Sequence, residues 1–106
     1  MPRKKGRGSR AEKRVADLYK KAGYSIKRNV RSRVGEIDII ATRNNQKWII
    51  EVKSGKQKIT SKQIKKLVNK AKYHHGKPVL RHSSRSSLTK VAKKFAKKYN
   101  VRVKKY

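Results

Sequence analysis

The chain has no cysteine and only five acidic residues among its 106. Without cysteine it can form no disulfide, no thiolate nucleophile and no zinc–thiolate site. No stretch approaches the roughly 20 apolar residues of a membrane span. No apolar segment follows the basic start, so we expect no secretory signal. What remains is a small, polar chain with enough length for one domain.

Positive charge dominates what is present, because 34 Lys and Arg residues face those five acids and give a formal net charge of +29. Such a chain repels itself unless a polyanion neutralises it, and nucleic acid is the commonest polyanion. An anionic membrane is the alternative, but the basic residues are spread along the chain instead of forming one amphipathic helix. We therefore expect a nucleic-acid partner, no membrane, and a cytoplasmic location beside the genome.

Hydrophobic periodicity predicts helices and strands in the order α-β-β-β-α-β-α-β, an α/β fold in which helices flank a mixed sheet. In this prediction residues 9–106 form one domain and residues 1–8 a flexible basic arm. Ser9, Ser61 and either Ser86 or Ser87 are the predicted helix N-caps. Strands are predicted at residues 24–30, 36–42, 47–53, 78–82 and 101–103.

The two central strands are predicted to form a hairpin around Asn44-Asn45, because Asn tolerates the positive φ of a tight turn. With that turn, Asp38 lies across from Glu51. Side-chain alternation then gives one apolar face, made of Ile37, Ile39, Ala41, Trp48, Ile50 and Val52. The opposite face gathers the polar residues Glu36, Asp38, Glu51 and Lys53.

The opposed carboxylates of Asp38 and Glu51 need an explanation in so basic a chain, because like charges across a strand pair are destabilising. A hard divalent ion such as Mg²⁺ between them would remove the repulsion, since it takes oxygen ligands. The alternative is a surface hairpin with cross-strand ion pairs, which accounts for Glu36 opposite Lys53 but not for the two acids. The pattern therefore favours a metal site.

Glu12 lies at the edge of the buried stripe of the first predicted helix, where it could lean toward the sheet. Its alternative role is the glutamate of a capping box with Ser9, and the two roles are compatible. Asp17 lies on the far side of that helix between Lys13 and Lys21, a solvated arrangement to which we assign no chemistry.

Glu12, Glu36-Ile37-Asp38 and Glu51-Val52-Lys53-Ser54 together resemble the motif of the PD-(D/E)xK nuclease superfamily. Within it the chain is most similar to the small archaeal Holliday junction resolvases, over roughly residues 4–80, including Gly8-Ser9, Lys62-Gln63-Ile64 and Gly76-Lys77-Pro78. Ile37 stands where those proteins have Pro. The segment 86–106 looks more like the closing helix and strand of restriction-type or repair nucleases. The resemblance implies a restriction-endonuclease-like sheet flanked by helices.

The resemblance also implies a reaction, hydrolysis of DNA phosphodiesters with Mg²⁺, for which Mn²⁺ can substitute. Asp38 and Glu51 would bind the ion with the carbonyl of Val52, and Glu12 would hold a ligand water or a second metal. Lys53 would orient the attacking water and stabilise charge on the phosphate.

Glu36 and Gln63 are possible accessory residues. Gln63 would contact the site or the DNA, although an exposed polar role near a helix N-terminus is the alternative for it. The family also implies a homodimer that presents two sites to branched duplex DNA.

Three functions stay open at this point. The first is a structure-selective DNA endonuclease that resolves four-way junctions, the second a restriction- or repair-type nuclease of the same superfamily, and the third a non-catalytic basic nucleic-acid-binding protein. The third has no use for the opposed carboxylates. The candidate phosphate-binding residues are Arg3, Lys4, Lys5, Arg7, Arg10, Arg31, Arg33, Lys56, Lys58 and Lys62.

Overall fold

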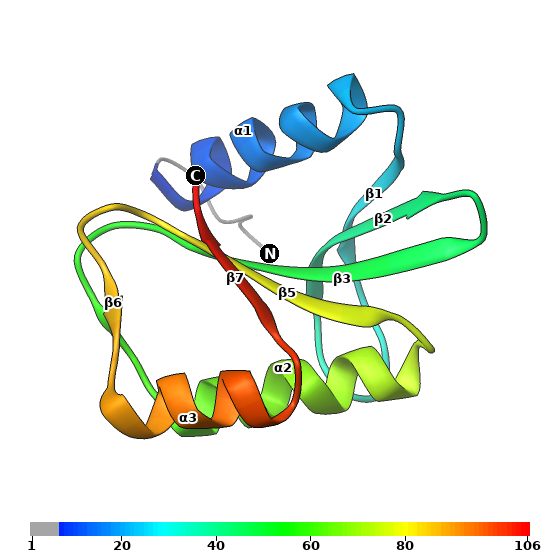
Figure 1. The fold of residues 1–106 in the computed structure, drawn as a ribbon. Coiled ribbons are helices and arrows are strands. Elements are labelled where there is room, and N and C mark those ends of the chain that lie inside the picture. The colour runs from blue at the N-terminus through cyan, green and yellow to red at the C-terminus, as the bar shows by residue number, and fades with distance from the viewer. Residues whose placement is uncertain (1–6) are drawn as a thin grey trace.

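The computed structural model describes residues 7–106, and it consists of a mixed sheet between two helical layers. The helices are α1 (Arg7–Lys21), α2 (Ser61–Tyr73) and α3 (Lys90–Lys98). The main sheet contains β1 (Ser25–Val30), β2 (Ile37–Arg43), β3 (Gln46–Lys53), β5 (Lys77–His82) and β7 (Arg102–Lys105). Two short strands, β4 (Lys58–Ile59) and β6 (Ser87–Leu88), pair with each other outside it. Figure 1 shows α1 on one face of the sheet and α2 and α3 on the other.

The sheet has the order β1-β2-β3-β5-β7. Its first three strands are antiparallel, and β3, β5 and β7 run parallel through the crossover helices α2 and α3. The fold class is the predicted one, a restriction-endonuclease-like mixed sheet flanked by helices. The sequence did not predict β4 and β6, because a strand of two residues carries no periodicity.

The predicted hairpin register is confirmed over most of β2 and β3. Asn44 and Asn45 have φ values of 52° and 65°, as a tight turn requires. The paired residues run from Arg43 opposite Gln46 to Ile39 opposite Ile50. The ladder ends there, short of the predicted opposition of Asp38 and Glu51, and β2 begins one residue later than predicted.

Two apolar clusters fill the spaces above and below the sheet. One joins α1 to Ile39, Ala41, Ile50 and Val52, and the other joins α2 and α3 to Ile40 and Ile49. Ile37 belongs to the second cluster and not, as predicted, to the first. The β1–β2 pairing skips Asn29, whose φ is 53°. The change of side falls at this distortion. Ile39, paired with Arg28 before it, packs in the α1 cluster, whereas Ile37 and Val30, paired after it, pack against the α2 layer.

The helix starts differ from the predicted ones. Thr60 caps α2 and Thr89 caps α3, each through a side chain that accepts a backbone N–H. Ser9 lies inside α1, two residues after its first residue, so it caps nothing. The predicted cap Ser87 is drawn into β6 instead. Among the helices of residues 7–106, none is long and apolar enough to cross a membrane.

Candidate active site

Asp38 lies where the ladder between β2 and β3 ends. Its side chain is buried, with 7% exposed, and its Oδ2 accepts a hydrogen bond from the backbone N–H of Val52 at 2.8 Å. The carboxylate therefore takes the place of the next main-chain partner of β3. This contact holds Asp38 beside the peptide that joins Glu51 to Val52. The two parts of the sequence motif, on β2 and on β3, therefore lie next to each other.

Glu51 extends from β3 toward the α2 side of the sheet, between two ammonium groups. Its Oε2 lies 3.4 Å from Lys53 Nζ, and its Oε1 lies 3.5 Å from Lys70 Nζ. All three side chains are largely buried, with 15–22% exposed. Lys70 also donates to the backbone carbonyl of Glu36 at 2.8 Å, which ties the start of β2 to α2.

The carbonyl of Val52 lies on the same side of β3 as Asp38. Main-chain groups of successive strand residues point to opposite neighbours. The Lys53 carbonyl accepts from Ser83 N at 3.0 Å, on the β5 side. The N–H and carbonyl of Val52, one residue earlier, therefore face β2 and Asp38. Two carboxylates and one backbone oxygen thus lie around the point where the strands separate.

This donor set suits Mg²⁺, which binds proteins through one or two carboxylates and keeps several waters. Within residues 7–106, no three acidic or histidine side chains gather closely enough to hold a metal ion. The protein would therefore supply Asp38, Glu51 and the Val52 carbonyl, with water in the remaining positions.

Glu12 comes from the other face of the sheet. It is buried on α1, with 4% exposed, and its Oε1 lies 3.6 Å from a guanidinium nitrogen of Arg28 on β1. The prediction that Glu12 turns toward the sheet is confirmed by this burial. Because it approaches from the α1 layer, Glu12 does not complete a three-carboxylate cluster with Asp38 and Glu51.

The two accessory candidates have structural surroundings that the sequence did not indicate. Glu36 is exposed and precedes β2, and Lys53 pairs with Glu51 instead of with Glu36. Gln63 closes a capping box, because its Oε1 accepts from the N–H of Thr60 at 2.8 Å while Thr60 Oγ1 accepts from Gln63 N. The Gln63 side chain is therefore engaged in starting α2.

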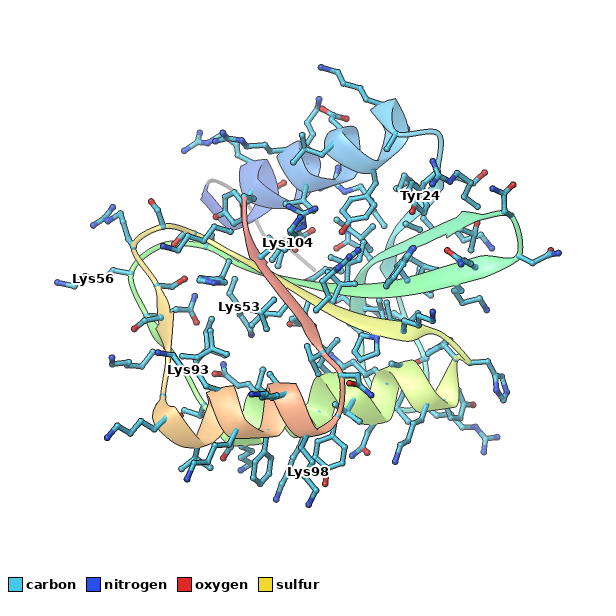
Figure 2. All side chains as sticks on the ribbon, in the orientation of Figure 1. Tyr24, Lys53, Lys56, Lys93, Lys98 and Lys104 are labelled. Atoms are coloured by element: carbon cyan, nitrogen blue, oxygen red, sulfur yellow. The ribbon has the colours of Figure 1, made fainter. Side chains whose placement is uncertain are left out.

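The candidate phosphate-binding residues are spread over several elements. Arg3, Lys4 and Lys5 lie outside the described residues, and for Arg7 the structure gives only its position in α1. The others are exposed: Arg10, Arg31, Arg33, Lys56, Lys58 and Lys62. Lys56 extends away from the ribbon in Figure 2, beside the segment that leads into β4.

Three features of the site escaped the sequence analysis. Lys70 is one of many lysines in α2, and only its position three residues after the buried Leu67 set it apart. Arg28, the partner of Glu12, carried no signal among the basic residues of β1. His82 ends β5 as a buried residue, although the sequence offered no metal spacing or other reason to select it.

Curated proteins with similar sequences are UPF0102 proteins of bacteria. The chain is 48% identical to that of Thermotoga neapolitana over 50 residues, 46% of this chain and 47% of that one. It is 34% identical to that of Persephonella marina over 77 residues, 64% of this chain and 66% of that one. The chain thus matches about half to two thirds of the length of these relatives.

Solved structures share the fold. A protein of unknown function, AF1548, superposes with a TM-score of 0.71 at 21% identity, over 89% of this chain and 55% of that one. EndoMS in its apo form superposes with a TM-score of 0.62 at 14% identity, over 99% of this chain and 48% of that one.

A family model named Mrr_cat and described as "Restriction endonuclease" matches residues 4–105. With the motif and the fold in agreement, the chain belongs to this restriction endonuclease family, within the PD-(D/E)xK nuclease superfamily.

Proposed function

We propose that this protein is a Mg²⁺-dependent DNA endonuclease that hydrolyses phosphodiesters, with branched duplexes such as four-way junctions as its preferred substrate. One observation carries the proposal. Asp38 accepts a hydrogen bond from the Val52 amide at the end of the β2–β3 ladder. Val52 stands between Glu51 and Lys53 in the chain, so this contact brings the residues of the motif together. The hydrogen bond itself serves stability, whereas a second carboxylate, Glu51, beside it in so basic a chain suits a metal-dependent hydrolase.

The roles of the side chains follow from where they lie. Asp38, Glu51 and the Val52 carbonyl would hold the ion, which when bound activates water and stabilises charge on the phosphate. Lys53, 3.4 Å from Glu51, is close enough to orient the attacking water and to neutralise a phosphate oxygen. Glu12, buried beside Arg28, would hold a ligand water from the α1 side.

The preference for DNA junctions rests on the likeness of the motif to the resolvases. That likeness also implies two copies of the chain on one junction, each cutting one strand. The match to a restriction endonuclease model supports a second candidate, a nuclease that cuts linear duplexes. A net charge of +29 suits either substrate, because both are polyanions.

The proposal is tested by incubating the protein with a four-way junction, a linear duplex of the same sequence and RNA, with Mg²⁺, with Mn²⁺ and with EDTA. Asp38→Asn and Glu51→Gln are the active-site variants, and Asp17→Asn is the matched control, since it removes one exposed carboxylate from α1. We expect Mg²⁺- and Mn²⁺-dependent cleavage by the wild type and the control. Either active-site change should lower the rate at least about 100-fold while DNA binding persists.

The substrates separate the candidates. Symmetric cuts in the junction support the resolvase reading, and cutting of the linear duplex without junction preference supports the restriction- or repair-type nuclease. Tight binding with no cleavage under any metal would overturn the proposal and leave a basic nucleic-acid-binding protein.

A further inference from the structure

A second concave site lies beside the candidate active site, at the edge of the sheet formed by β7. It is a cavity of about 500 Å³ among β5, β6, α3 and β7. Leu88, Val101 and Val103 give it apolar walls, Lys93, Lys97 and Lys105 surround it with positive charge, and His82, Ser86 and Ser87 complete the lining. Neither the motif of the nuclease superfamily nor the proposed metal site uses these residues.

The cavity is connected to the catalytic strand through adjacent residues of the sheet. Lys53 on β3 is paired with His82 on β5, and His82 is paired with Lys105 on β7. Neighbouring strands lie about 4.8 Å apart, so His82 is one strand away from Lys53. Figure 2 shows Lys53 and Lys93 on the α3 side of the sheet. A strand of DNA that passes Lys53 would therefore reach the cavity within about one nucleotide.

The polar end of the cavity is held in a fixed arrangement. His82 and Ser86 are both buried, and His82 Nδ1 lies 2.9 Å from Ser86 Oγ and 3.0 Å from the Ser83 carbonyl. The Ser86 hydroxyl gives its one proton to that same carbonyl, at 2.9 Å. Nδ1 is therefore the donor in its contact with Ser86, which fixes the orientation of the ring. The cavity so combines apolar walls with an oriented imidazole.

We propose that this cavity binds a single unpaired nucleotide of the DNA substrate, next to the phosphate that is cut. A nucleobase has apolar faces for Leu88 and Val103 and polar edges for the imidazole of His82. Its phosphate would lie against Lys93 and Lys97, which are one helical turn apart on α3. The proposal rests on the proposed nuclease function and names its substrate class, namely duplexes that present an unpaired nucleotide near the cleavage point.

A purely apolar ligand fits the cavity less well, because three lysine side chains surround it. Phosphate contact alone needs no apolar hollow, since exposed lysines elsewhere on the chain already offer it. The joint requirement for a flat apolar group and a negative charge is met by a nucleotide.

The inference is tested by binding in EDTA, so that it does not depend on cleavage. The wild type is titrated by anisotropy with two duplexes that differ by one unpaired 2-aminopurine nucleotide, whose own fluorescence is also recorded. We expect about tenfold tighter binding of the duplex with the unpaired nucleotide, from the apolar area that it buries, and a change in 2-aminopurine emission on binding. Equal affinity for the two duplexes would overturn the proposal, whether or not the protein cuts DNA.

Variants assign the preference to the cavity. Lys93→Ala with Lys97→Ala, and separately Val103→Phe, should reduce the tenfold preference to less than about twofold. The matched control is Lys90→Ala with Lys94→Ala, two exposed lysines of the same helix with the same spacing that do not line the cavity. The control should weaken both duplexes equally and keep their ratio. An unchanged ratio in both cavity variants would remove the cavity from recognition.

Free dAMP distinguishes a nucleotide of DNA from a soluble one. If dAMP competes with the duplex only at millimolar concentration, and no longer competes in Val103→Phe, the result supports a cavity that takes its nucleotide from DNA. If the protein binds dAMP more tightly than the duplex with the unpaired nucleotide, the proposal that the nucleotide comes from DNA is overturned. That result would indicate a soluble nucleotide ligand instead.

Discussion

Asp38 has a structural role as the acceptor of the Val52 N–H and a proposed role in binding Mg²⁺, and two substitutions separate the two. Asp38→Ala removes the acceptor of the buried Val52 N–H, whose bond is 2.8 Å long. A buried donor left without a partner costs about 1–3 kcal/mol. For a domain of this size that lowers the melting temperature by about 5–15 °C. Asp38→Asn keeps a side-chain oxygen for the same N–H and should lower it by less than about 5 °C.

The chemical function is read from the response to Mg²⁺. At 10 mM ion and a dissociation constant near 1 mM, binding would stabilise the wild type by about 1.4 kcal/mol. We expect the corresponding rise in melting temperature for the wild type and none for Asp38→Asn or Asp38→Ala. The melting is followed by the fluorescence of Trp48, which is the one tryptophan of the chain.

Sodium chloride of matched ionic strength serves as the control, because any salt changes the self-repulsion of so basic a chain. An alanine variant as stable as the wild type would refute the structural role of the Asp38–Val52 bond. A variant Asp38→Asn that still gains stability from Mg²⁺ would show that Asp38 does not bind the ion.

Three further substitutions test other contacts. Lys70→Met removes an ammonium 3.5 Å from Glu51, so Mg²⁺ should bind up to about fivefold more tightly in a calorimetric titration; weaker binding would contradict competition between Lys70 and the ion. Gly76→Ala would place a Cβ 2.8 Å from Cγ1 of Ile49 and should cost about 1–3 kcal/mol in urea unfolding. A loss below about 0.5 kcal/mol would contradict this clash. Thr60→Ala removes the cap of α2 and should cost about 1 kcal/mol in the same assay with unchanged DNA affinity; a stability equal to that of the wild type would contradict the cap.

The sequence predicted the parts of the fold that periodicity determines. The apolar stripes of the helices and the alternation in β2 and β3 predicted the layers, and Asn44-Asn45 predicted the hairpin register. The helix caps were predicted less well, because serines stand near each helix start while the capping residues are Thr60 and Thr89. Local composition does not show which of two nearby hydroxyl residues caps a helix. At α3 the choice depends on β6, because Ser87 belongs to that strand and Thr89 is left to cap the helix.

For the candidate site, the sequence predicted the residues better than it predicted their geometry. The motif selected Asp38, Glu51 and Lys53, and the structure brings them to the end of one ladder. The direct opposition of the two acids was not found, because the side chain of Asp38 replaces the main-chain partner of Val52. Lys70 could not be selected, since its contact with Glu51 depends on how α2 crosses the sheet.

The placement of the carboxylates has a consequence for how copies of the chain meet. Glu12 and Asp38 are buried, Glu51 lies between two lysines, and Asp17 pairs with Lys13 at 3.1 Å, so the acidic side chains offer little negative charge to a neighbour. Two such surfaces repel each other until a polyanion lies between them. Self-association is therefore expected to follow bound DNA, and sedimentation at low salt should give single chains without DNA and paired chains with it.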